Sequence, residues 1–231
     1  MKKPIIIALD FDTEQAALSL LEQVDPGLCR VKIGKELFTA CGPQFVHRVV
    51  KEGFDVFLDL KFHDIPNTVS AAVMRAADLG VWMINLHASG GLGMMEQARQ
   101  SLERVGEERP LLIAVTVLTS LVKQDLVAIG LNCEPQDQVL RLADLARKAR
   151  LDGVVCSATE TAFLRRETGQ DFLLVTPGIR RPEDASGDQR RVTGPAEAMA
   201  NGSDFLVVGR PITRASSPRQ ALQDFITATS G

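Results

Sequence analysis

The chain has 231 residues, of which 45% are hydrophobic and 24% are charged, and its formal net charge is −3 at pH 7. This composition is ordinary for a globular protein and excludes a mainly disordered chain. The slightly negative charge and the scarcity of aromatic residues (ten Phe, one Trp and no Tyr) argue against a protein that binds nucleic acid.

No apolar run approaches the roughly 18 residues that a membrane span needs. The run nearest the amino terminus, Ile5–Leu9, is too short for the apolar part of a signal peptide, and two acidic residues follow it closely, at Asp10 and Asp12. The cysteines have neither C-x-x-C nor zinc-site spacing; they are Cys29, Cys41, Cys133 and Cys156. We therefore expect buried free thiols in a cytoplasmic protein, with neither nucleic acid nor a membrane as partner.

Short β-branched or aliphatic runs alternate with helix-like segments along the chain. The runs expected to form strands are, in chain order, Ile5–Leu9, Val31–Ile33, Val56–Leu60, Met83–Leu86, Leu111–Leu118, Val154–Cys156, Phe172–Val175 and Phe205–Val208. Amphipathic segments expected to form helices lie between them, as at Thr13–Leu21, Thr68–Leu79 and Asp137–Arg150. A further short helix is expected at Leu121–Ile129, as an insertion over one end of the fold.

Strands that alternate with helices predict a parallel sheet, because parallel strands need crossover connections. The eight runs begin about 29 residues apart on average, close to one strand plus one helix, and eight strands close a (β/α)8 TIM barrel. No linker or low-complexity stretch divides the chain. We therefore predict the α/β class and a single (β/α)8 barrel domain over residues 1–231. An open doubly wound sheet is the alternative that the strand count does not exclude.

Charged residues interrupt the third run. In VFLDLKF (Val56–Phe62) the side chains alternate between an all-apolar face and a face that carries Asp59 and Lys61. The apolar face suits packing against helices, so the charged face is expected to line the barrel at the carboxyl end of the strand. Asp10 follows the first run, and Lys32 lies in the second. Active sites of barrels lie at this end, and charges are rarely buried without partners, so these four residues form the candidate site.

The loop HDIPNT (His63–Thr68) follows the third run directly. Its proline disfavours a helical conformation at Ile65, and Asn67 or Thr68 is expected to cap the next helix. Asp64 is then expected at the barrel mouth, where it completes a D-x-K-x-x-D pattern.

A lysine among three carboxylates is expected to keep its proton, because nearby opposite charge favours the charged form. Such a lysine suits a proton donor or an electrostatic anchor better than a nucleophile. A divalent ion held by Asp10, Asp59 and Asp64 is the weaker alternative, because Lys32 and Lys61 would compete with it. We therefore expect no metal.

The last two runs end in TPGIR and VVGRPI. Loops after the seventh and eighth strands are the usual phosphate site of a (β/α)8 barrel. Gly209 would let the backbone approach a phosphate, and Arg180 and Arg210 would make charge-assisted contacts with it. The segment Arg181–Arg191 is polar and basic at its end, which predicts a mobile lid, with a plain surface loop as the alternative.

The segment DLKFHDIPNT (Asp59–Thr68) closely resembles the signature of the orotidine 5′-phosphate decarboxylase family. Further motifs resemble that family in the same order along nearly the whole chain: ALDF at Ala8–Phe11, VKIGKELF at Val31–Phe38, VLTS at Val117–Ser120, TPGIR at Thr176–Arg180, DQRR at Asp188–Arg191 and VVGRPI at Val207–Ile212. The resemblance implies a (β/α)8 barrel that converts orotidine 5′-monophosphate (OMP) to uridine 5′-monophosphate (UMP) and CO2. It also implies a homodimer with shared active sites, and no cofactor or metal.

The resemblance further implies roles for individual residues. Lys61 would give a proton to C6 of the pyrimidine. It would belong to an array whose members are Lys32, Asp59, Lys61 and Asp64, the last supplied by the neighbouring subunit. The residues implied to bind substrate are Asp10 and Lys32 at the ribose, Asp59 near the substrate carboxylate, Thr119 at the pyrimidine, Thr68 from the partner chain, and Gln189, Gly209 and Arg210 at the phosphate, with Arg180 supporting the lid.

Two other functions stay open. A sister decarboxylase or aldolase acting on a sugar phosphate would share the barrel and the D-x-K-x-x-D core. It would use magnesium and would lack the IPNT continuation seen at Ile65–Thr68. A non-catalytic nucleotide sensor would keep the phosphate site alone, and the charged array argues against it. Sensitivity to a chelator distinguishes the first alternative, and tight nucleotide binding without turnover distinguishes the second.

Overall fold

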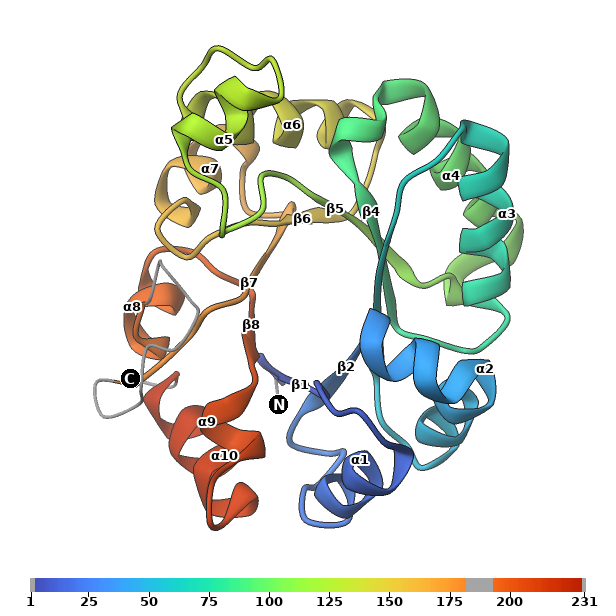
Figure 1. Ribbon diagram of the computed structural model, residues 1–231, viewed down its shortest axis with the longest axis vertical. Coiled ribbons are helices and arrows are strands. Elements are labelled where there is room, and N and C mark those ends of the chain that lie inside the picture. The colour runs from blue at the N-terminus through green and yellow to red at the C-terminus, as the bar shows by residue number, and fades with distance from the viewer. Residues whose placement is uncertain (1–2, 182–192, 230–231) are drawn as a thin grey trace.

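Eight parallel strands close into a barrel at the centre of the molecule (Figure 1). The structure is a computed structural model, and it describes residues 3–181 and 193–229. The strands are β1 (Ile5–Ala8), β2 (Arg30–Gly34), β3 (Val56–Phe62), β4 (Met83–His87), β5 (Leu111–Val115), β6 (Gly153–Val155), β7 (Leu173–Thr176) and β8 (Phe205–Val208). Each pairs with the next in chain order, and β8 pairs with β1. The closure confirms the predicted (β/α)8 barrel and excludes the open sheet.

Helices surround the barrel (Figure 1). They are α1 (Glu14–Leu21), α2 (Lys35–Lys51), α3 (Pro66–Ala77), α4 (Leu92–Leu102), α5 (Lys123–Ala128), α6 (Pro135–Lys148), α7 (Thr161–Thr168), α8 (Pro195–Ala200), α9 (Arg210–Thr213) and α10 (Pro218–Ala228), with 3-10 turns at Ala88–Gly90 and Glu103–Glu108. The short α5 occupies the interval where the sequence predicted an inserted helix. No helix in the described part of the chain is both long and apolar enough to cross a membrane.

Most expected element boundaries shift by one or two residues, and two of the differences bear on the site. The run Leu111–Leu118 ends as a strand at Val115, and Val117 and Leu118 beyond it line a cavity. Helix α3 begins at Pro66, and neither Asn67 nor Thr68 caps it. Proline is well suited to the first helical position, where its missing N–H leaves no hydrogen bond unmade, and it holds the preceding residue extended.

The buried side chains form two apolar clusters on the two sides of the sheet. The larger cluster lies between the strands and the helices and includes Val56 and Leu58. The smaller cluster fills the barrel and consists of Ile6, Ala8, Phe57, Met83, Ile113, Val175 and Val207. Successive residues of β3 alternate between the two clusters, as predicted from the period of a strand. The charged face of β3 therefore continues the inside of the barrel beyond this apolar plug.

All four cysteines are free. Cys29 and Cys156 are buried, as expected, whereas Cys41 and Cys133 are only partly covered. Burial raises the pKa of Cys29 to about 12, so its thiol stays protonated at physiological pH.

Candidate active site

Four charged side chains meet at the carboxyl ends of β1, β2 and β3. The ammonium group of Lys32 lies 3.0 Å from Asp10 Oδ1 and 3.3 Å from Asp59 Oδ2. The ammonium group of Lys61 lies 2.6 Å from Asp59 Oδ1. The structure thus brings together the four residues that strand phase singled out, in an unbroken row of alternating charge: Asp10, Lys32, Asp59 and Lys61.

Mutual attraction keeps the two most buried members of this row charged. Lys32 is 9% exposed and Asp59 is 8% exposed. Burial alone would lower the pKa of Lys32, but the carboxylates of Asp59 and Asp10 outweigh it, and the net pKa lies above the ordinary lysine value. Burial alone would raise the pKa of Asp59, but Lys32 and Lys61 outweigh it, and the net pKa lies below the ordinary aspartate value. Both groups are therefore ionised near neutral pH.

A buried amide that the sequence analysis missed completes this network. Asn85 lies in β4, and its side-chain Nδ2 donates to Asp59 Oδ1 at 2.6 Å. Its Oδ1 accepts the backbone N–H of Lys61 at 2.8 Å. An asparagine at the centre of the buried run MINLH (Met83–His87) was the available signal, because it shares its phase with Met83 inside the barrel.

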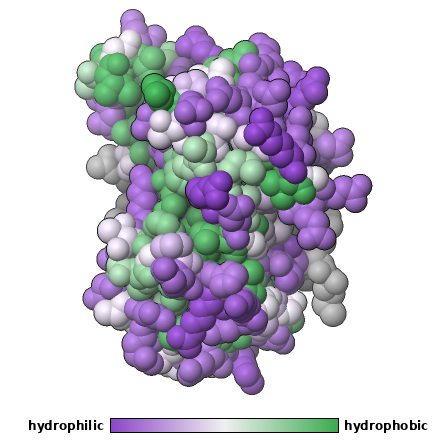
Figure 2. Space-filling view, turned by 90° about the vertical axis from the view of Figure 1, so that its right-hand side faces the viewer, coloured by the Kyte–Doolittle hydropathy of each residue, from purple (hydrophilic) through white to green (hydrophobic). Residues whose placement is uncertain are grey.

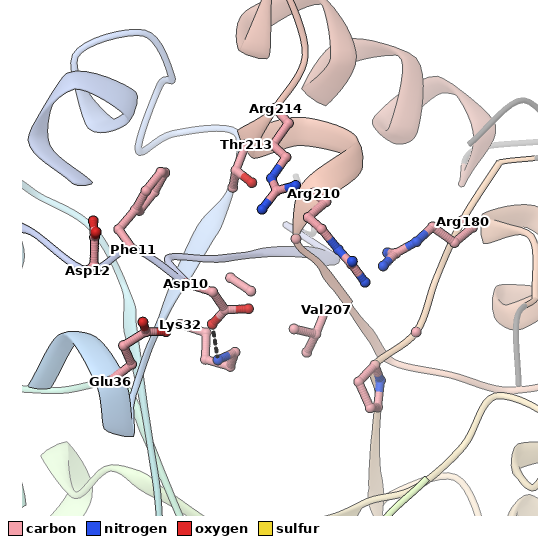
Figure 3. Close-up of a pocket in the computed structure, with 14 residues that line it drawn as sticks. Asp10, Phe11, Asp12, Lys32, Glu36, Arg180, Val207, Arg210, Thr213 and Arg214 are labelled. Atoms are coloured by element: carbon pink, nitrogen blue, oxygen red, sulfur yellow. Dashed lines mark hydrogen bonds and ion pairs between the residues drawn. The ribbon is translucent and has the colours of Figure 1, made fainter. Parts of the chain in front are cut away.

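Two adjoining cavities open at this end of the barrel. The smaller has a volume of about 190 Å³; its charged lining is Lys32, Asp59 and Lys61, and Thr119 also borders it among apolar strand ends. The larger has a volume of about 670 Å³ (Figure 3). Lys32 lines both. The site therefore consists of a small cavity that is partly lined by charged groups and a larger, more polar cavity that adjoins it.

Arginines that follow β7 and β8 in the chain line the larger cavity. Arg180 is 6% exposed, and Figure 3 shows its side chain and that of Arg210 pointing toward each other. Arg214 also borders the cavity, and the sequence analysis missed it. It lies four residues after Arg210, directly after the end of α9, and this spacing was a usable signal. Guanidinium groups that converge on one space favour a phosphate or carboxylate ligand.

Gly209 borders the same cavity. A Cβ atom at this position would lie 3.7 Å from Ala8 Cβ and 3.8 Å from Asp10 Oδ2, which are ordinary contacts. Packing within the described chain therefore does not require glycine here.

The remaining predicted residues lie away from this row. Asp64 and Thr68 are exposed, and Asp64 Oδ1 accepts the backbone N–H of Ile65 at 2.6 Å. Among the residues that the structure describes, Asp64 makes no ion pair with Lys61. Three carboxylates were expected around Lys61. Among the described residues, the ammonium group of Lys61 pairs with Asp59, whereas Asp10 pairs with Lys32.

The predicted phosphate ligand Gln189 lies outside the described residues. So does most of the segment predicted as a lid, from residue 182 onward.

The described residues contain no group of three or more His, Cys, Asp or Glu side chains that could hold a metal ion. The ammonium group of Lys32 lies between Asp10 and Asp59, and that of Lys61 lies against Asp59.

The fold and the site together define a (β/α)8 barrel whose arginine-lined cavity, at the usual active-site end, suits an anionic ligand. A family model described as "Orotidine 5'-phosphate decarboxylase / HUMPS family" matches residues 3–225. The chain belongs to this family, which confirms the resemblance read from its motifs.

Individual relatives agree with the family model. The chain is 59% identical over 223 residues to the orotidine 5′-phosphate decarboxylase of Actinobacillus pleuropneumoniae serotype 5b (strain L20), covering 96% of this chain and 97% of that one. It has the same identity, over the same share of both chains, to the enzyme of that name from Haemophilus influenzae (strain ATCC 51907 / DSM 11121 / KW20 / Rd). A crystal structure of orotidine 5′-phosphate decarboxylase from Lactobacillus acidophilus has a TM-score of 0.88 and 39% identity, covering 99% of this chain and 100% of that one. These comparisons confirm the predicted carboxy-lyase class.

Proposed function

We propose that this chain converts OMP to UMP and CO2 in the last step of de novo pyrimidine nucleotide synthesis, without a cofactor and with Lys61 as proton donor to C6. The row of alternating charge through Asp10, Lys32, Asp59 and Lys61 carries the proposal. It places a positively charged proton source inside a small chamber, beside a carboxylate that is held ionised.

The two cavities suit the two ends of a nucleotide. The phosphate would occupy the larger cavity at Arg210 and Gly209, with Gln189 as a further ligand and Arg180 in support. The pyrimidine would occupy the smaller cavity beside Thr119. The ribose hydroxyls would then lie where the cavities meet, within reach of Asp10 and Lys32. This orientation brings C6 of the base to the charged side of the small chamber.

Decarboxylation breaks the bond between C6 and the carboxylate carbon, and the electron pair of that bond stays on C6 as CO2 leaves. The ammonium group of Lys61 stabilises the developing negative charge, because a fixed positive charge in a poorly solvated chamber interacts strongly with it. The same group then donates its proton to C6, and solvent returns a proton to the lysine. The substrate and one proton thus give UMP and CO2.

Asp59 contributes through repulsion and position. Its buried carboxylate would lie near the carboxylate of the substrate, and this repulsion would be relieved as CO2 departs. Contacts with the distant phosphate supply binding energy that holds the substrate in this arrangement. Asp59 also holds the ammonium group of Lys61, at 2.6 Å.

We further propose a cytoplasmic homodimer in which Asp64 and Thr68 of one subunit complete the site of the other. Both residues are exposed, and Ile65 beside Asp64 is 67% exposed. Figure 2 shows apolar surface on the face of the molecule that carries α2 and α3. A groove of about 480 Å³ there is lined by residues of α2, β3 and α3. Exposed apolar surface next to two exposed polar residues of the expected site supports a shared site.

The function is tested by the ultraviolet absorbance change of OMP with purified protein in excess chelator. We expect conversion to UMP at the same rate with and without the chelator, because ammonium groups and not a metal ion stabilise the developing charge. No conversion by folded protein, together with magnesium-dependent activity on a sugar phosphate, would establish the sister enzyme instead. Tight binding of UMP without turnover would establish the nucleotide sensor.

Replacing Arg210 with alanine is expected to raise the KM for OMP roughly 10- to 100-fold, the usual range for losing a hydrogen bond between charged groups. Decarboxylation of the nucleoside orotidine, which has no phosphate, should change little. Steady-state kinetics on both substrates measures the difference. Arg166→Ala is the matched control, because Arg166 is an exposed arginine on α7 and lines neither cavity. An unchanged KM for OMP in Arg210→Ala would contradict the phosphate role.

A further inference from the structure

We propose that Asn85 is a positioning residue that fixes the ammonium group of Lys61 for proton transfer. This inference rests on the proposed role of Lys61 as the proton donor. It extends the site to a side chain that lies outside both cavities.

A single amide ties together the two ends of Lys61. Asn85 Oδ1 accepts the backbone N–H of Lys61 at 2.8 Å, and Asn85 Nδ2 donates to Asp59 Oδ1 at 2.6 Å. The same carboxylate oxygen lies 2.6 Å from the ammonium nitrogen of Lys61. The contacts therefore form a closed ring from the lysine backbone through Asn85 and Asp59 to the lysine side chain. Chemistry fixes the orientation of the amide, because an N–H needs an acceptor and an ionised carboxylate needs a donor.

The backbone of Lys61 needs such a tether. Its φ is 53°, in the left-handed region that is unfavourable for residues other than glycine. The register between β3 and β4 shifts between Leu58 and Phe62, and the N–H of Lys61 is bonded there by the Asn85 side chain. Backbone strain of this kind persists only where the surroundings enforce it. The hydrogen bond from the Lys61 N–H to Asn85 Oδ1 is one contact that holds this conformation.

The position of the ammonium group matters because lysine has a long, flexible side chain. A misplacement of about 1 Å at a reacting group is enough to cost roughly 100-fold in rate. Asn85 is fully buried and borders neither of the two cavities. Its loss is therefore expected to lower kcat and to leave substrate binding nearly unchanged, because it acts through Asp59 and Lys61.

Asn85→Asp tests the proposal with a side chain of the same shape. The introduced carboxylate still accepts the N–H of Lys61, but while ionised it donates nothing to Asp59 and repels it. We expect kcat to fall roughly 100-fold at pH 8, with the KM for OMP and the Kd for UMP within about threefold of wild type. Burial and the neighbouring Asp59 carboxylate raise the pKa of the introduced group, whereas the ammonium groups of Lys61 and Lys32, which both lie against Asp59, lower it. As the pH falls, that group takes up a proton and regains a donor, so kcat of the variant should rise relative to wild type.

Asn85→Ala provides a second measurement. It removes the acceptor of the Lys61 N–H, so hydrogen exchange at that amide should accelerate at least about tenfold over wild type. Thr161→Val is the matched control, because it removes a fully buried hydroxyl that donates to the carbonyl of Ala158 and borders neither cavity. The control should lose stability and keep kcat.

The outcomes separate this inference from the proposed function. The positioning role is overturned if both Asn85 variants keep kcat within about threefold of wild type. It is also overturned if the variants raise KM by as large a factor as they lower kcat. A kcat for Asn85→Asp that stays low at every pH at which the variant is folded would also overturn it. If Lys61→Ala loses turnover and the Asn85 variants keep it, the positioning role of Asn85 is rejected and the proton-donor role of Lys61 stands. Substantial turnover in Lys61→Ala would reject the proton donor and this inference together.

Discussion

Replacing Lys61 with alanine is expected to lower the turnover of OMP roughly 10⁴-fold or more. The substitution removes the positive charge that stabilises the carbanion and the group that protonates it, and each effect is typically worth at least about 100-fold. The fold should persist, because Asp59 keeps its ion pair with Lys32 and its hydrogen bond from Asn85.

The absorbance assay measures this loss of turnover, and circular dichroism with UMP binding checks that the variant is folded and its site formed. Lys51→Ala is the matched control, because Lys51 is an exposed lysine at the end of α2 that lines neither cavity. Turnover in Lys61→Ala within about tenfold of wild type would remove the lysine from both roles.

Mixing two inactive variants, Lys61→Ala and Asp64→Ala, is expected to restore activity. If each site takes its lysine from one subunit and its second aspartate from the other, every hybrid dimer contains one intact site and one doubly defective site. Random exchange of equal amounts gives hybrids as half of all dimers, so about a quarter of the wild-type activity should return. The absorbance assay, followed over time after mixing, measures the recovery.

A mixture of Lys61→Ala with Asp59→Ala is the control for this experiment. Both residues come from the same subunit, where their side chains lie 2.6 Å apart. No hybrid site in that mixture is intact, and no recovery is expected. If Lys61→Ala and Asp64→Ala subunits exchange, as shown by a size or affinity tag, and activity stays absent, then Asp64 does not act across the subunit boundary.

Much of the barrel was predictable from local pattern. Strands of a parallel barrel are covered on both faces, so they stand out as apolar runs, and their spacing matched one strand and one helix per repeat. The ends of the strands were harder to predict, because an apolar run can belong to a strand or to the wall of a cavity. Leu111–Leu118 contains both, with the strand ending at Val115. For α3 the sequence predicted a cap from Asn67 or Thr68. The helix begins instead at Pro66, whose ring suits the first helical position.

The sequence predicted which charged residues belong to the candidate site, but it did not predict which of their side chains contact each other. The period of a strand was enough to put Asp59 and Lys61 on the inner face, because alternation depends only on neighbouring residues. Which carboxylate each lysine meets depends on side-chain reach across strands. For this reason Asp10 contacts Lys32 and not Lys61.

The sequence by itself determined the fold, the family and the four charged residues at the barrel mouth, since these follow from periodicity and from motifs in a fixed order. The tertiary structure decided the role we assign to Asn85, the left-handed backbone of Lys61 and the convergence of Arg214 on the arginine-lined cavity. Asn85 lies 24 residues from Lys61 and 26 from Asp59. Contacts at such separations depend on strand register, and the register of β3 against β4 shifts between Leu58 and Phe62, close to these residues.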